Sequence, residues 1–341
     1  MFQFIFQRKW VKKFSAIVFV VVLPSLLLFF CFRQFDFHHF WTEIQHAEWG
    51  WLLMAFLIPL LIPYLFAIQW RLFISDIRVV SVTCLFEIVS IWLMTINIVP
   101  FFGGHATAFF LLNKKGKISK IESLSVLTLD QISEGFSRLA VFAVVGLSVA
   151  LPFWIKKGVQ GVVFLVLIFY IILLVFAFHY RKLKKVELDE TKGIMNKWMY
   201  HFSQWAHSLH VLRSLRKTLL AFLISLGIKG VDVLAILLVQ HAFALSLPLW
   251  TPFLLIAALS LTTMLPIAPG QLGIFEATVF FVYQYLGIEG NLALILAVFH
   301  HIVHVIPFII LGYFSSLKLG LKNQLLFHKQ IQPVLSTDVP L

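Results

Sequence analysis

Charged side chains inside long apolar stretches are the residues of this chain best suited to chemistry. Asp130, Glu134 and Arg138 follow one another at intervals of four residues, so a helix would place them on one face. Glu134 and Arg138 are predicted to form an ion pair. Asp130 has no partner on its own helix, so we expect it to contact a polar ligand. A purely structural ion pair is the alternative to a polar face that lines a headgroup path.

A second set of charges lies later in the chain. Lys229 and Asp232 are three residues apart and are predicted to pair, unless an anionic group enters and competes with Asp232 for Lys229. Glu276 falls in the first turn of a predicted short helix, where a carboxylate stabilises its own helix N-terminus. A carboxylate deep in a membrane could also attract a cationic headgroup or carry a proton.

Three histidines, His300, His301 and His304, follow in the last apolar stretch. His300 and His304 have the spacing of a metal-binding pair, but no His-Glu-x-x-His pattern or cysteine ligand accompanies them. The sequence therefore predicts polar packing or headgroup contact at His301, and neither a metal nor another cofactor. The sequence also lacks Gly-x-Ser-x-Gly and nucleotide-loop motifs, so no catalytic residue is assigned.

The elements that position these residues must be membrane helices. The chain has 341 residues, of which 60% are hydrophobic and only 12% are charged, with a mean hydropathy of +0.94. Apolar runs long enough to cross about 30 Å of hydrocarbon recur along it. We expect an all-α polytopic membrane protein with one domain over 1–327 and a disordered tail over 328–341. About eight transmembrane helices are predicted, near residues 14–32, 50–70, 79–98, 121–150, 159–179, 218–243, 251–265 and 290–317.

Proline and glycine interrupt two of the apolar stretches, at Asn97–His105 and Met264–Glu276. Broken helices in corresponding halves are typical of transporter binding sites. We predict that each interruption turns back within the membrane into a short re-entrant helix, near 104–112 and 272–286, although simple kinks would also explain the prolines. The helix N-termini would then converge on an anionic group such as a lipid phosphate, and the glycines would let the backbone approach it closely. The candidate lipid-binding residues are Asn97, Pro100, Gly103, Gly104, His105, Asp130, Glu134, Arg138, Lys229, Pro269, Gly270, Gly273, Glu276 and His301.

The distribution of positive charge predicts the orientation. When both interruptions turn back, most of the 27 Lys and Arg residues fall on one side, which the positive-inside rule makes cytoplasmic. Both termini lie on that side, and the two halves become an inverted repeat. Residues 196–216 have the apolar spacing of an amphipathic helix in the cytoplasmic headgroup layer. The net charge of +12 indicates anionic membrane lipids as partners, not nucleic acid.

Three of these segments resemble the signatures of a bacterial membrane family. They are Pro100-Phe-Phe-Gly-Gly, Leu129-Asp-Gln-Ile-Ser-Glu-Gly-Phe136 and Leu265-Pro-Ile-Ala-Pro-Gly-Gln-Leu-Gly-Ile-Phe-Glu-Ala277. The family is the lysylphosphatidylglycerol synthase transmembrane-region family of flippase-like integral membrane proteins. The resemblance implies a multi-pass protein of the bacterial cytoplasmic (inner) membrane, without the aminoacyl-transfer domain of the two-function members. The chain departs from the family pattern at His105 and Ala108, and at His300-His301, where the family often has an arginine.

Three functions are compatible with these observations. A translocator that flips an anionic phospholipid or a lipid-linked phosphate would explain the broken helices, the polar membrane residues and the resemblance. An integral-membrane enzyme acting on lipid-linked substrates would use His105, Asp130 or the last-span histidines. The third possibility is an accessory subunit for lipid or polyprenyl-linked glycan synthesis, held beside a lipid synthase or a glycosyltransferase.

Overall fold

The computed structural model describes residues 22–33, 36–75, 78–99, 103–148, 214–263 and 268–320, with single residues between 157 and 171. Every regular element in these ranges is a helix, which confirms the all-α prediction. Three helical segments are long and apolar enough to cross a membrane: Trp49–Ile74, α11 (Leu215–Ala242) and α14 (Gly290–Lys318). The protein is therefore an integral membrane protein.

Apart from α3 (Phe37–His46), the remaining helices follow the predicted segments closely. The segment Trp49–Ile74 consists of α4 (Trp49–Leu57), a short 3-10 turn η2 (Ile58–Leu60) and α5 (Leu61–Ile74). The other elements are α2 (Leu23–Phe32), α3 (Phe37–His46), α6 (Val82–Ile98), α7 (Gly103–Lys114), α8 (Lys120–Ser148), α12 (Thr251–Thr262), η5 (Pro269–Gln271) and α13 (Ile274–Tyr285). The amphipathic helix predicted at 196–216 lies outside the described residues apart from its last three positions. Most of the span at 159–179 and all of the tail at 328–341 also lie outside them.

The helix α8 has 29 residues, which corresponds to about 44 Å at 1.5 Å per residue. That length exceeds the hydrocarbon thickness of a bilayer. Its central turns carry Asp130, Glu134 and Arg138, so α8 is less apolar than the three segments above. Ser119 and Glu122 form a capping box at its start, where the Ser119 N–H donates to Glu122 Oε2 at 2.9 Å.

One helix, α3, lies where the sequence predicted only a connection. Asp36 caps its start, because the His38 N–H donates to Asp36 Oδ1 at 2.8 Å. Trp41 on this helix is exposed. An aspartate followed by helix-spaced apolar residues, here Phe40, Trp41 and Ile44, is the sequence signal that indicates this helix.

The first Pro/Gly interruption forms a helical hairpin. The helix α6 ends at Ile98, and α7 begins at Gly103 and packs back against α6. A Cβ atom at Gly104 would lie 2.7 Å from the Ile96 Cα, so only glycine permits this close approach. The predicted short helix near 104–112 is thus present and folds back on its predecessor.

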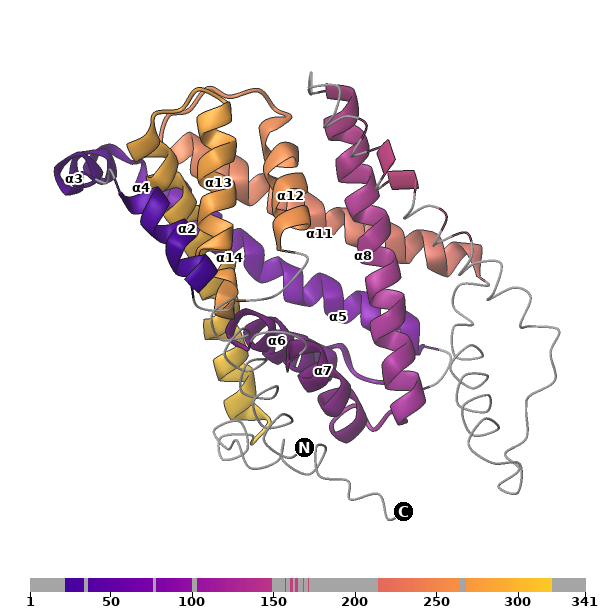
Figure 1. The fold of residues 1–341 in the computed structure, drawn as a ribbon. Helices are drawn as coiled ribbons and strands as arrows, with labels where there is room; N and C mark the ends of the chain where they lie inside the picture. Colours follow the sequence, from indigo (N-terminus) through magenta and orange to yellow (C-terminus); the bar gives the residue numbers. More distant parts are fainter. Residues whose placement is uncertain are drawn as a thin grey trace, which may run out of the picture.

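The second interruption forms another hairpin, in which α13 packs against α12. The turn contains η5 and ends at Gly273, whose φ of 84° lies in the left-handed region that favours glycine. Figure 1 shows the α12–α13 hairpin in the upper part of the molecule and α6–α7 below it. The element η5 packs against α6, so the second turn lies against the helix that leads into the first.

The helices α6 and α14 form an extensive contact in the centre of the fold. A Cβ atom at Gly312 of α14 would lie 2.6 Å from the Ser90 carbonyl oxygen of α6, so the two backbones approach as closely as small residues allow. Trp70, Ile88 and Ile91 are fully buried in the adjoining apolar core. This tight packing holds the two hairpins and the long helices in one body.

Candidate functional site

Three ionisable side chains project from the middle of three long helices. Glu134 is the central residue of α8, and His304 is the central residue of α14. Lys229 is one of the two central residues of α11. In a helix that spans a membrane the central residues lie near the middle of the bilayer, where charge is least stable.

Four of the charged residues form a continuous cluster between α8 and α11. Arg138 Nη2 lies 2.6 Å from Glu134 Oε1, and Lys229 Nζ lies 3.4 Å from Asp232 Oδ2, which confirms both predicted ion pairs. Lys229 Nζ also lies 3.8 Å from Glu134 Oε1, so the two pairs join across the helices. We call these four residues, Glu134, Arg138, Lys229 and Asp232, the central charge cluster. Each positive charge in it has a negative partner.

The residue of α14 that lies closest in charge interaction to this cluster is His304. His304 is exposed, and it lies within electrostatic range of Lys229 and Asp232. The outer face of the helix carries the exposed Ile302 and Ile306. Successive helical residues are separated by about 100°, so His304 projects from the opposite side to these isoleucines. His304 therefore lies on the side of α14 that faces α11.

The first hairpin brings His105 to the same region. His105 is the third residue of α7, within electrostatic range of Glu134. Its ring centroid lies 6.0 Å from that of Trp92 on α6. The buried Trp92 Nε1 has no hydrogen-bond partner among the described residues, so a polar donor remains unsatisfied beside the cluster.

Asp130 has a different environment from the one that its position on α8 indicated. The carboxylate is 1% exposed, and the Trp70 Nε1–H of α5 donates to its Oδ1 at 2.8 Å. Gln131 Nε2 lies 3.3 Å from the other oxygen. Asp130 thus joins α8 to α5 through a buried hydrogen bond, and sequence spacing had given no sign of Trp70 as its partner.

A second set of polar residues surrounds the second turn, which precedes α13. The Gly273 N–H donates to Glu276 Oε2 at 2.6 Å, and His301 Nδ1 lies 2.5 Å from Glu276 Oε1. His301 Nε2 lies 2.9 Å from the Gly270 carbonyl oxygen. We call Gly270, Gly273, Glu276 and His301 the second-turn network. Glu276 therefore stabilises the start of its own helix and also connects the turn to α14.

Phe275 and His304 lie between the second-turn network and the central charge cluster. The Phe275 ring stacks on His301 at 4.6 Å and on His304 at 5.8 Å between centroids. His304 in turn lies within electrostatic range of Lys229 and Asp232. The candidate residues thus form two groups that adjoin one another, and His304 joins them although it was not among the predicted lipid-binding residues.

The glycines at the turns approach protein backbone in this structure. A Cβ atom at Gly270 would lie 3.1 Å from the Asn97 carbonyl oxygen, and one at Gly273 would lie 2.8 Å from the Pro24 Cα of α2. Valine at position 273 would therefore collide with α2, and it would also strain a backbone with positive φ.

The remaining predicted residues add little to these two groups. The Asn97 side chain donates to the Leu93 carbonyl oxygen at 2.8 Å within its own helix. His300 does not pair with His304, because its Nε2 lies 2.7 Å from the Tyr283 hydroxyl. Among the described residues, no three His, Cys, Asp or Glu side chains are grouped so that they could hold a metal ion. Pro100 and the side chain of Pro269 lie outside the described part of the structure.

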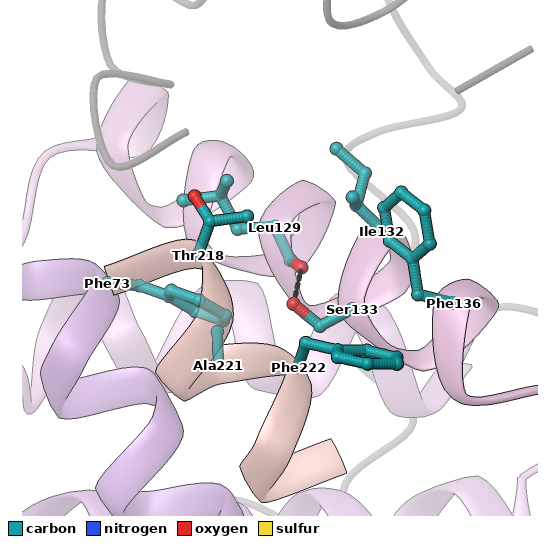
Figure 2. A pocket seen from close by; sticks show the side chains of 8 residues that line it. All are labelled: Phe73, Leu129, Ile132, Ser133, Phe136, Thr218, Ala221 and Phe222. Atoms are coloured by element: carbon teal, nitrogen blue, oxygen red, sulfur yellow. Dashed lines mark hydrogen bonds between the residues drawn. The ribbon is translucent and has the colours of Figure 1, made fainter. Parts of the chain in front are cut away.

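An apolar pocket lies beside the central charge cluster, between α5, α8 and α11. Figure 2 shows its lining side chains, and Ser133 turns its hydroxyl toward the Leu129 carbonyl oxygen of its own helix, 2.9 Å away. The lining residues are Phe73, Leu129, Ile132, Ser133, Phe136, Thr218, Ala221 and Phe222. The α8 wall of the pocket belongs to the same turns as Glu134, but no residue of the central charge cluster lines it.

These features define the class first: a helical integral membrane protein with ion pairs between and within α8 and α11. Comparison with protein families then identifies the group. The family model for the lysylphosphatidylglycerol synthase TM region matches residues 15–312, so the chain belongs to that family. A comparison with curated proteins finds no match.

Proposed function

We propose that this protein binds an anionic phospholipid or a lipid-linked phosphate and moves it between the two leaflets of the membrane. The observation that carries the proposal is the central charge cluster, which joins α8 and α11 at their midpoints and adjoins the exposed His304. Charged residues inside a membrane cost free energy, and they commonly line the path of a polar or ionic substrate. A headgroup that crosses the bilayer needs such a path.

Lys229 is the residue proposed to bind the phosphate. It contacts two carboxylates, Asp232 at 3.4 Å and Glu134 at 3.8 Å. An entering phosphate would replace the longer contact, because Glu134 keeps Arg138 as a partner at 2.6 Å. The N-terminus of α13 is less suitable, because Glu276 already accepts a hydrogen bond there. We therefore place the headgroup beside Lys229, with His105 and His304 bordering it.

The hydrocarbon tail of such a lipid would stay in an apolar environment. The pocket between α5, α8 and α11 has mainly apolar walls (Figure 2), but its free volume of about 20 Å³ has room for about one water molecule. The tail itself would therefore lie in the bilayer beside the helices.

The two hairpins are proposed to be halves of an inverted repeat in the bacterial cytoplasmic membrane, with both termini in the cytoplasm. They approach the centre from different ends of the molecule (Figure 1), and their turns adjoin through η5 and α6. Inverted repeats with broken helices that meet near the midplane are a recurrent transporter design.

The orientation predicts that the basic connection between α7 and α8 is cytoplasmic. Lys120→Cys is a suitable reporter, because Lys120 is exposed and the neighbouring Ser119 is needed for the helix cap. In a background without the free cysteines Cys31 and Cys84, an impermeant thiol reagent is expected to label position 120 only after the cells are opened. Labelling of intact cells would contradict the inverted arrangement.

Reconstitution into proteoliposomes tests the translocation itself. Purified protein is incorporated with a trace of fluorescent phosphatidylglycerol, and a membrane-impermeant quencher reports how much probe reaches the outer leaflet over time. We expect faster exchange than in protein-free vesicles. Exchange no faster than in those vesicles, with phosphatidylglycerol and with a polyprenyl phosphate probe, would reject translocation. Copurification with a lipid synthase or a glycosyltransferase would then favour an accessory subunit.

A further inference from the structure

The second-turn network has an unusual balance of donors and acceptors. His301 Nδ1 faces Glu276 Oε1 at 2.5 Å, and His301 Nε2 faces the Gly270 carbonyl oxygen at 2.9 Å. A carbonyl oxygen only accepts hydrogen bonds, and so does an ionised carboxylate. A neutral imidazole donates through only one of its nitrogens. Neutral His301 beside ionised Glu276 would therefore leave one of these two contacts without a proton.

We propose that Glu276 and His301 together form a proton-binding site that holds one dissociable proton. The two contacts are satisfied when His301 is an imidazolium that donates to both oxygens. They are equally satisfied when Glu276 is protonated and donates to Nδ1 while Nε2–H donates to Gly270. Both arrangements contain one proton more than a neutral histidine with an ionised glutamate. On release, this proton passes to water, and the pair keeps one N–H and one carboxylate.

The surroundings of the pair show how such a proton would enter. The side chains of His301 and Glu276 are 9% and 7% exposed, but His304, one turn further along α14, is exposed. His304 lies within electrostatic range of His301 and also of Lys229 and Asp232 on α11. The other titratable groups nearby are the Cys31 thiol of α2, close to Glu276, and His300, whose ring contacts Tyr283. His304 therefore connects the pair to the central charge cluster.

The position of the pair gives the proton a mechanical role. The hydrogen bond between His301 and the Gly270 carbonyl oxygen links α14 to the second turn. Gly270 in turn packs closely on the Asn97 carbonyl oxygen at the end of α6. Loss of the proton would leave either the His301 Nδ1 lone pair facing the Glu276 carboxylate or the Gly270 carbonyl oxygen without a donor. The contact between α14 and the second turn would then weaken. Protonation would thus control whether the second turn is held against the first hairpin.

The substitution Glu276→Gln removes the extra proton while keeping the hydrogen bonds of the second-turn network. The glutamine oxygen still accepts from the Gly273 N–H, while its amide N–H donates to Nδ1 of a neutral imidazole whose Nε2–H bonds to Gly270. Every contact is kept, but the extra proton is no longer needed. The matched control is His241→Gln, which changes an exposed histidine of α11 away from both polar groups.

The direct measurement is spectroscopic and does not depend on transport. Nitrogen-15 NMR of histidine-labelled protein in nanodiscs reports the protonation of both nitrogens of His301, assigned by their loss in His301→Gln. Infrared difference spectra report a protonated carboxyl that disappears in Glu276→Gln. Near neutral pH we expect either an imidazolium or a protonated carboxyl in the wild type, lost on raising the pH. In Glu276→Gln, a neutral imidazole is expected throughout, and His241→Gln should match the wild type.

A neutral His301 beside an ionised Glu276 at neutral pH would overturn the proton-binding site. Its role in coupling rests on the proposed function and is tested separately, by following lipid exchange as pH is raised. We expect a pH-dependent rate in the wild type and a rate independent of pH in Glu276→Gln. A pH dependence that survives in Glu276→Gln would overturn the coupling role. Vesicles without any lipid exchange would reject translocation while the spectra still decide the proton site.

Discussion

Replacing Glu134 by glutamine is expected to remove most of the folded protein, whereas replacing Arg138 should be far milder. Glu134 contacts both Arg138 and Lys229, at 2.6 Å and 3.8 Å. Its loss leaves Arg138 without this partner and removes one of the two carboxylates beside Lys229, so two positive charges of a membrane protein lose their shared counter-charge. In Arg138→Gln, by contrast, Glu134 keeps Lys229. The yield of monodisperse protein in mild detergent and its thermal unfolding measure both effects.

The double variant Glu134→Gln/Arg138→Gln gives the control for this prediction. It removes one charge of each sign and leaves the pair of Lys229 and Asp232 in place. Since exchanging a whole buried ion pair for neutral groups is often close to neutral in free energy, the double variant should be more stable than Glu134→Gln alone. The predicted pairing would be contradicted by equal, unimpaired yields of the two single variants and the double variant.

Contacts within one helix could be predicted from the sequence, because helix geometry places residues three and four positions apart side by side. The ion pairs Glu134–Arg138 and Lys229–Asp232 are of this kind, and both are present. Contacts between helices depend on how the helices pack, which no spacing reveals. The hydrogen bond from Trp70 to Asp130 joins residues 60 positions apart, and it turns the expected ligand contact into a buried partner.

In the hairpins, too, the local structure could be predicted from the sequence and the tertiary contacts could not. Proline and glycine break helices through local geometry, so the short helices at α7 and α13 could be located from the sequence to within a few residues. The neighbour that each glycine accommodates is set by tertiary structure. Gly273 meets Pro24 of α2, a contact that the sequence gave no means to predict. The accessible His304 likewise required knowledge of which face of α14 lies inward.

Replacing Lys229 by glutamine is expected to slow lipid exchange in proteoliposomes at least about tenfold. A hydrogen bond between charged groups contributes about 1.5–3 kcal/mol, and each 1.4 kcal/mol corresponds to about a factor of ten in binding. Lys229 is the cluster residue whose contact with Glu134 an incoming phosphate would replace. Lys229→Arg keeps the charge and should retain more of the exchange rate than Lys229→Gln.

A structural role of Lys229 would produce a different pattern, because its loss leaves Asp232 without this partner at 15% side-chain exposure. The double variant Lys229→Gln/Asp232→Asn removes that unpaired charge and should restore folding to near the wild-type level. If Lys229 binds the phosphate, the double variant folds normally but still exchanges lipid slowly. If Lys229 only neutralises Asp232, folding and lipid exchange recover together. Recovery of both would therefore reject Lys229 as the phosphate ligand, since the only interaction restored is the balance of charge within α11.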